Sequence, residues 1–362
     1  MYLKDLVDIQ MGQSPDSKFY NYDKIGLPFY QGKADFGRIN PTPKIWCSKS
    51  KKEAKPNDIL ISVRAPVGDL NINNEQSCIG RGLAAITCRP DVDMMYLYYY
   101  LKYLKPQLKH ISTGSTFESI NRTQLENLII NYKPYLEQIK ISNILQVVER
   151  QIEVKENLLS WYDLLVKSRF VEMFEVFNIN PNNYNTIKFK DLIERNNINE
   201  EDKVWLLNLD MIKPNTGEIV EKVYINRQNI PASSISFKKG TVLYSKLRPY
   251  LNKVVIADEN GYGTSELIPL NSYKNGLTAE YLAYYLRQDS FVDYIKDKVT
   301  GAKMPRVAMD ILRNIDIIQP NYIYQEQFSS FVNHVNKLKS DVQKSIDETQ
   351  LLMDSLMQEY FG

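Results

Sequence analysis

Three short segments in the first third of the chain combine basic side chains with amides, hydroxyls and glycine. They are residues 30–38 (YQGKADFGR), 62–68 (SVRAPVG) and 113–122 (TGSTFESINR). Arginine and lysine side chains donate hydrogen bonds to guanine edges and phosphates, while asparagine and glutamine match the edge of adenine. These residue types therefore favour recognition of a nucleic acid over the making or breaking of bonds.

Two of the three segments have counterparts in the second half of the chain. Residues 245–250 (SKLRPY) correspond to 62–68, and residues 300–307 (TGAKMPRV) correspond to the third segment. Residues 205–210 (WLLNLD) replace the glycine-rich segment, and the arginines Arg64 and Arg248 differ in register by one position. The predicted contact residues are Gln31, Lys33, Asp35, Arg38, Arg64, Thr116, Asn121 and Arg122 in the first half and Lys246, Arg248, Tyr250, Lys303 and Arg306 in the second.

The sequence contains no familiar catalytic signature. It has no Walker A loop, HExxH, GxSxG, or Asn-Pro-Pro-Tyr tetrapeptide. Residues 79–85 (IGRGLAA) fit a degenerate GxGxxA pattern, but the residues that follow are typical of a strand instead of a helix. Three widely spaced cysteines and two histidines make a structural zinc site improbable. We expect a non-catalytic chain without its own cofactor or metal.

The elements that must position these residues occur twice along the chain. Residues 4–6 (KDL) recur at 190–192, and residues 96–101 (YLYYYL) match 281–286 (YLAYYL). The offsets between matched blocks stay between 183 and 187 and their order never changes, which indicates a duplicated domain. We expect short strands at 58–63, 83–88, 241–244 and 253–257, and tyrosine-rich helices near 93–104 and 279–288, so the predicted class is α+β.

Each copy ends in a long segment that lacks glycine and proline. The segments run from 136 to 177 and from 321 to 361, and each follows a proline, Pro134 or Pro320. Apolar residues recur every third or fourth position, which predicts two helices of about 38 residues that pack on each other as an antiparallel coiled coil. The predicted helix positions include Ile141, Leu145, Val148, Ile152, Leu159, Val332, Val335, Val342, Ile346 and Leu356.

This pattern divides the chain into globular modules at 1–134 and 178–320 and helices at 135–177 and 321–362. The first module carries 18 basic and 13 acidic residues and the second 19 and 17, whereas the helices carry 5 against 7 and 3 against 6. The modules, more than the helices, are suited to a polyanion. Because the whole chain has a net charge of only +2, binding by bulk charge is excluded.

The sequence shows no apolar stretch long enough for a membrane span or a signal peptide. Cysteine usage fits reduced thiols. We therefore expect an intracellular, cytoplasmic protein with no membrane partner.

The motifs together resemble the specificity subunit of Type I restriction-modification systems. The similar residues are 12–15 (GQSP), 31–37 (QGKADFG), 62–68, 113–116 (TGST) and the Glu-Gln pairs at 137–138 and 326–327. The resemblance covers essentially the whole chain, and residues 205–210 depart from it. It implies a pseudo-twofold architecture of two target-recognition domains held apart by the two antiparallel helices.

The resemblance also implies partners and cofactors. Each domain would read one half of a bipartite sequence in double-stranded DNA. The helices, with the ten positions named above, would bind two methyltransferase subunits that carry S-adenosylmethionine. Restriction subunits that use ATP and Mg²⁺ would join indirectly, and this endonuclease complex would assemble around a non-catalytic chain.

Two other hypotheses stay open. The chain could be a coiled-coil scaffold for protein partners without direct DNA readout, in which case base-specific competition would be absent from a binding assay. It could also be a self-contained restriction enzyme, which magnesium-dependent cleavage by the pure chain would reveal.

Overall fold

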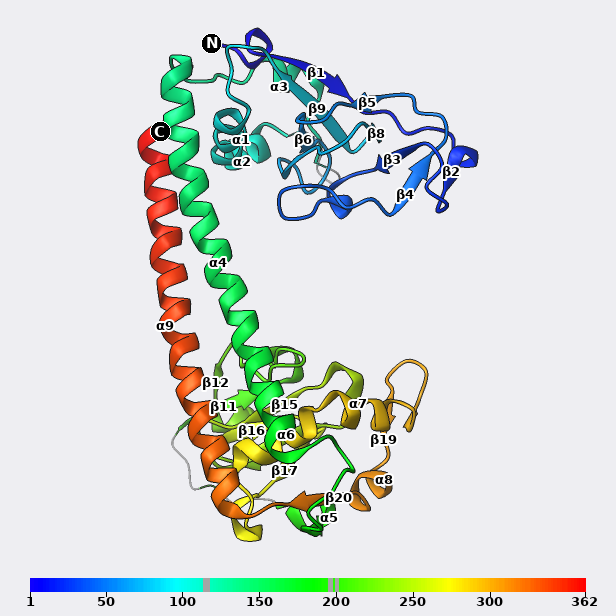
Figure 1. The fold of residues 1–362 in the computed structure, drawn as a ribbon, viewed down its shortest axis with the longest axis vertical. Helices are drawn as coiled ribbons and strands as arrows, with labels where there is room; N and C mark the ends of the chain where they lie inside the picture. The colour runs from blue at the N-terminus through cyan, green and yellow to red at the C-terminus, as the bar shows by residue number, and fades with distance from the viewer. Residues whose placement is uncertain (113–117, 195–197, 199–201) are drawn as a thin grey trace. The chain divides into compact units, whose positions relative to one another are not determined.

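The computed structural model describes residues 1–112, 118–194, 198 and 202–362. These residues form two compact units. The first unit contains Met1–Lys155 and Ser345–Gly362, and the second contains Glu156–Lys344. Two long helices, α4 (Tyr135–Phe174) and α9 (Tyr322–Phe361), are each divided between the units (Figure 1).

Two sheets form the β structure of the first unit. One is antiparallel with the strand order β1-β9-β6-β7, and the other has the order β2-β4-β3-β8-β5, in which β3 and β8 run parallel. The strands are β1 (Val7–Met11), β2 (Tyr20–Asn21), β3 (Leu27–Tyr30), β4 (Ile45–Cys47), β5 (Glu53–Ala54), β6 (Ile59–Ser62), β7 (Leu70–Ile72), β8 (Ser77–Ile79) and β9 (Leu83–Cys88).

The second unit has sheets in the orders β15-β14-β17 and β12-β11-β16-β13, with two strand pairs, β10-β20 and β18-β19. Its strands are β10 (Asn185–Lys188), β11 (Lys203–Leu207), β12 (Val223–Asn226), β13 (Ile235–Phe237), β14 (Val242–Ser245), β15 (Val254–Ile256), β16 (Gly261–Gly263), β17 (Leu267–Leu270), β18 (Val299–Thr300), β19 (Arg306–Val307) and β20 (Asp316–Gln319).

The two units share their sheet topology. The order β4-β3-β8-β5 of the first unit matches β12-β11-β16-β13 of the second, and in both the inner pair is parallel. The central strands β6 and β14 likewise lie between an antiparallel neighbour on each side. The duplication and the α+β class predicted from the sequence are confirmed. The strands predicted at 58–63, 83–88, 241–244 and 253–257 correspond to β6, β9, β14 and β15.

Short helices occupy equivalent places in both units. Asp93 accepts a hydrogen bond from the backbone N of Tyr96 at the start of the first tyrosine-rich helix, and Thr278 does the same for Tyr281 in the second. Because β9 follows Gly82, the GxGxxA pattern leads into a strand. The helices are α1 (Met94–Tyr103), α2 (Lys105–Ile111), α3 (Arg122–Glu126), α5 (Phe189–Leu192), α6 (Ala279–Arg287), α7 (Asp289–Lys296) and α8 (Met309–Arg313).

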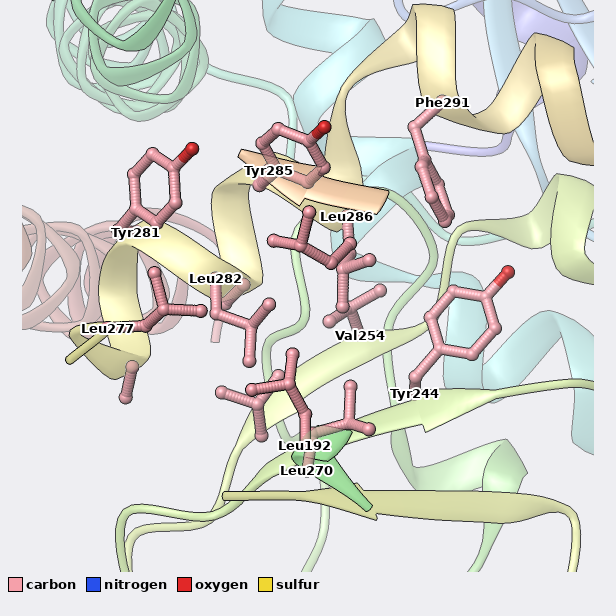
Figure 2. Packing of buried hydrophobic residues seen from close by; sticks show 14 of the residues in the cluster. Leu192, Tyr244, Val254, Leu270, Leu277, Tyr281, Leu282, Tyr285, Leu286 and Phe291 are labelled. Carbon is pink, nitrogen blue, oxygen red and sulfur yellow. The ribbon is translucent and has the colours of Figure 1, made fainter. Parts of the chain in front are cut away.

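The tyrosine-rich helices supply much of each core. In the second unit, Leu282 and Leu286 of α6 lie over Val254 and Leu270 of the sheet β15-β14-β17, while the ring of Tyr281 points away from that sheet (Figure 2). All five side chains are buried. In the first unit, Tyr96 to Leu101 of α1 are buried as well.

The long helices pack against each other in antiparallel fashion within each unit. In the second unit Lys339 Nζ lies 2.6 Å from the carboxylate of Asp163, and the rings of Phe170 and Phe328 are 5.2 Å apart. In the first unit Lys155 Nζ donates a hydrogen bond of 2.6 Å to Thr349 Oγ1. The two predicted helices are therefore confirmed.

The ends of α4 and α9 insert equivalent phenylalanines into the two tyrosine-rich helices. Phe174 packs edge-on against Tyr281 at 4.9 Å, and Phe361 packs edge-on against Tyr96 at 5.4 Å. Both pairs keep the spacing of the duplication. Each unit is therefore completed by the end of a helix that begins in the other unit.

The structure buries most of the predicted helix positions. Ile141, Leu145, Val148, Ile152, Val332, Val335 and Ile346 are buried, and Leu159, Val342 and Leu356 are partly buried. The buried side chains stabilise the packing of the chain itself, and their role in partner binding stays a prediction. Among the described residues, no helix has both the length and the apolar character of a bilayer span.

Candidate nucleic-acid interface

The glycine-rich segment 31–38 begins where β3 ends and turns through a short 3₁₀ helix, Lys33–Asp35. The Asp35 carboxylate accepts hydrogen bonds from the backbone N of Gln31 at 2.7 Å and of Gly32 at 3.4 Å. These bonds fold the segment back on itself and leave the side chain of Gln31 exposed. Asp35, predicted as a contact residue, thus shapes the segment, and its contact with DNA stays a prediction.

An ion pair joins this segment to the turn at 62–68. Lys33 Nζ lies 2.9 Å from Asp69, whose carboxylate is also bound by Lys105. Burial would raise the pKa of Asp69, but the two lysines outweigh burial and lower it. Asp69 therefore stays ionised and holds two predicted contact segments together.

The turn at 62–68 is fixed by its own hydrogen bonds and by residues 118–120. Ser62 Oγ donates to the carbonyl of Pro66 at 2.7 Å and accepts from the backbone N of Asp69 at 2.9 Å. Arg64 forms an isolated antiparallel bridge with Ser119. The Arg64 side chain is exposed and forms no ion pair within the described ranges, so it is free to contact a ligand.

The third predicted segment leads directly into α3. Asn121 caps this helix, because its side-chain oxygen accepts a hydrogen bond from the backbone N of Gln124 at 2.9 Å. Arg122 is paired with Glu126 at 2.6 Å. Both side chains therefore have partners within the chain that the sequence did not indicate. Thr116 lies outside the described residues.

Arg38 is exposed and lies close enough to α4 for its charge to act on Glu149. The Lys33–Asp69 pair and the Arg64–Ser119 bridge bring residues of three segments that are distant in sequence next to one another in the first unit.

In the second unit the turn at 245–250 is held against residues 305–307. The backbone N of Arg248 donates to the carbonyl of Pro305 at 2.8 Å, and that of Val307 donates to the carbonyl of Lys246 at 3.1 Å. Arg248 has a φ of 47°, a left-handed conformation that is uncommon for arginine. Such backbone strain persists only where the surroundings impose it, and it often marks a ligand-binding segment.

A bidentate ion pair stabilises the same surface. Arg306 donates to both oxygens of Glu266, with distances of 2.8 Å from Nη2 and 3.0 Å from Nε to Oε1. Lys303, three positions before Arg306, and Tyr250 of the facing turn are exposed, and Lys246 is half-buried. Arg306 is therefore engaged within the chain, while Arg248, Lys303 and Tyr250 remain exposed.

Two buried glutamines were missed as an equivalent pair. The side-chain amide of Gln138 accepts from the backbone N of Asp93 at 2.9 Å and donates to the carbonyl of Lys133 at 2.7 Å. Gln325 repeats this arrangement with Thr278 N and Pro320 O at 3.0 and 2.8 Å. The repeated Glu-Gln dipeptide suggests Gln327 as the counterpart of Gln138. The offset of 187 between the two long helices instead makes Gln325 the counterpart. Each glutamine locks the start of a long helix to a tyrosine-rich helix.

A basic and aromatic cluster beside β2 and β4 was also missed. The ammonium groups of Lys18 and Lys49 lie 5.1 and 5.7 Å from the ring centre of Phe19, and that of Lys24 lies 5.8 Å from Trp46. A run of lysines at 49, 51 and 52 was the available sequence signal. This cluster adds positive charge on the first unit.

Residues 1–160 match the family model of the type I restriction modification DNA specificity domain. Over these residues, which are fewer than half of the chain, the sequence is similar to that of type I restriction-modification specificity domains. The matched range contains all three contact segments of the first unit and the first half of α4. The family resemblance noted from the sequence is confirmed.

Relatives and solved structures agree with this family assignment. A Methanocaldococcus jannaschii protein named as the MjaX type I restriction enzyme specificity subunit is 45% identical over 148 residues, 41% of this chain and 35% of its own length. The MjaIX specificity subunit of the same organism is 23% identical and covers 98% of this chain and 90% of the relative. The chain thus spans about a third of the first relative and most of the second.

The crystal structure of a Type I restriction-modification S subunit from M. genitalium matches the whole fold. It covers 100% of this chain and 95% of that subunit with a TM-score of 0.56 at 14% identity. This likeness shows that the chain shares the fold of that structure. Within the described ranges, no group of three or more His, Cys, Asp or Glu side chains could hold a metal ion.

Proposed function

We propose that the chain reads DNA sequence for a type I restriction-modification complex. Each globular module would recognise one half of a bipartite double-stranded target, and the long helices would set the distance between the halves. The chain itself would perform no catalytic step. S-adenosylmethionine would be carried by methyltransferase subunits, and ATP and Mg²⁺ by restriction subunits.

The observation that carries this proposal is the assembly of separate contact segments into one surface of the first unit. The Lys33–Asp69 pair and the Arg64–Ser119 bridge join segments that begin at residues 31, 62 and 118. Exposed arginine, lysine and glutamine side chains on a rigid scaffold are suited to base edges and phosphates. The family assignment of residues 1–160 supports the same function.

Exposed apolar residues on α4 support docking of protein partners. Val147 and Trp161 are 57% and 66% exposed, and Ile144, Val154 and Leu165 are exposed too. These residues recur every three, four or seven positions along one helix. We propose this stripe, in place of the buried seam, as the surface for the methyltransferase subunits.

The experiment that tests the function is mapping of modified adenines in the genome with and without the gene. Loss of one bipartite motif on deletion, and its return on complementation, is the expected result. Band-shift assays with the purified chain and its methyltransferase should show competition by the motif and none by a scrambled duplex. Equal competition by both duplexes would favour the coiled-coil scaffold instead.

A further inference from the structure

The tyrosine-rich helix of the first unit is tied to α4 by the half-buried carboxylate of Glu149. Glu149 accepts hydrogen bonds from Tyr99 Oη at 2.6 Å and from Lys102 Nζ at 2.8 Å. Burial would raise the pKa of Glu149, but Lys102 and Tyr99 outweigh it and lower the pKa. The basic residue of this helix thus has an anionic partner within the chain.

The second unit repeats this arrangement without the carboxylate. At the offset of 185 residues, the counterparts of Tyr99 and Lys102 in the second unit are Tyr284 and Arg287. At the offset of 187 that relates the long helices, the counterpart of Glu149 is Asn336. The Arg287 guanidinium is 8% exposed and donates from Nε and Nη2 to the carbonyl of Val254 at 3.0 and 2.7 Å. Within the described part of the chain it forms no ion pair.

Most of the acidic groups near Arg287 are paired with lysines, as Glu218 is with Lys213 and Asp258 with Lys222. Burial lowers the pKa of Arg287, and Tyr284 and Asp163 offset this only in part. The carboxylate of Asp163 is bound by Lys339 at 2.6 Å. Asp289 faces Lys167 at 3.5 Å. Arg287 thus has two hydrogen bonds to a carbonyl but no ion-pair partner within the described ranges, and an unpaired charge is costly in a buried position.

Two cavities open where the missing carboxylate would be. One, of about 560 Å³, is lined by Tyr284, Arg287 and Asn336, and the other, of about 420 Å³, is lined by Tyr284, Arg287 and Phe170. Val171 and Val176 add apolar wall to the smaller cavity. The lining therefore includes the buried guanidinium, an amide, a phenol and an apolar surface, and its size suits a small organic molecule. Carboxylates and lysines line the two cavities as well, among them Asp163, Glu280 and Lys339.

We propose that the second unit binds a carboxylate between Arg287, Tyr284 and Asn336, at the place that Glu149 fills in the first unit. Arginine forms strong charge-assisted hydrogen bonds with carboxylates. The ligand would be a small organic acid with an apolar body or an acidic side chain of a partner subunit. This site is independent of DNA reading, so its failure would leave the proposed function untouched.

The test uses sodium benzoate as the probe and benzamide as its neutral analogue, titrated calorimetrically into the full chain. Benzoate should bind with one site and benzamide should not. The substitution Asn336→Glu places the carboxylate of the first unit beside Arg287 and should weaken benzoate binding about tenfold or more. Ser340→Glu adds the same charge to an exposed position of α9 outside both cavities and should leave binding unchanged.

The source of the carboxylate follows from repeating the titration on the complex with the methyltransferase. Benzoate binding retained in the complex indicates a free organic acid, and binding lost there indicates an acidic side chain of the partner. No benzoate binding by the free chain, or equal binding by the wild type and Asn336→Glu, would overturn the proposal.

Discussion

The two units have the same sheet order but hold their contact surfaces by different interactions. In the first unit the Lys33–Asp69 pair joins two contact segments and leaves Arg64 exposed. In the second, Glu266 engages Arg306, and Arg248 is set in a left-handed conformation. Duplication has thus preserved the scaffold while the surface residues diverged, as expected if the two modules recognise different sequences in the way we propose.

The largest effect should follow from removing the equivalent phenylalanines at the helix ends. Phe174→Ala and Phe361→Ala should each lower the free energy of unfolding of their unit by about 3 to 4 kcal/mol, because buried ring contacts are lost. Urea denaturation followed by circular dichroism measures this. Leu351→Ala, at an exposed position of α9, is the control and should change little. If Phe174→Ala is destabilising and Phe361→Ala is not, the two helix ends do not play the same part in the cores of their units.

Replacing the two buried glutamines tests whether the long helices begin in the same way in both units. Gln138→Leu and Gln325→Leu should each lower the free energy of unfolding by about 2 to 3 kcal/mol, because backbone groups lose their partners without access to water. Gln146→Leu removes one bond at an exposed position of α4 and serves as control. The same denaturation assay applies, and a marked difference between the two variants would contradict the equivalence of the helix starts.

The exposed arginines should affect binding more than stability. Arg64→Ala and Arg248→Ala should each weaken binding to the cognate duplex by about 1 to 3 kcal/mol and leave binding to unrelated duplexes nearly unchanged. Arg122→Ala, whose side chain is already paired with Glu126, should cost less. Competition band shifts measure all three. Equal losses on every duplex would make Arg64 a phosphate contact.

The smallest effect concerns pH. Because Lys105 and Lys33 lower the pKa of Asp69 in the folded state, its contribution to stability is present above the unfolded pKa, about 3.9, and is lost as pH falls through the folded pKa. The first unit should therefore lose stability on acidification below about pH 4, and Asp69→Asn should show a shallower loss. Thermal melts between pH 7 and pH 3 measure it. If the melting temperature falls equally steeply with pH in the wild type and in Asp69→Asn, the ion pairs of Asp69 do not stabilise the contact between the two segments.

The helices and the duplication could be predicted from the sequence because they depend on local patterns. The absence of glycine and proline, with apolar residues every third or fourth position, identified α4 and α9 to within a few residues of their ends. The tyrosine blocks at 96–101 and 281–286 located α1 and α6 for the same reason. Burial of these apolar helix positions followed from the same pattern, because the two helices pack on each other within the chain. Their role in partner binding stays a prediction.

The contact surface was only partly predictable. Residue types at 31–38 and 62–68 indicated polar recognition, but the pairing of Lys33 with Asp69 joins positions 36 residues apart and has no local signal. The cap at Asn121 and the clamp of Arg306 by Glu266 likewise depend on tertiary placement. Composition therefore indicated which segments matter, and only the fold showed which side chains are already engaged.

The most direct test of the central claim is the modified-adenine motif of a strain whose only copy of the gene carries Arg64→Ala. The account predicts that one half of the bipartite motif becomes relaxed while the other half and the spacing between them persist. A change in both halves, or a change in spacing alone, would contradict the assignment of one half to each module.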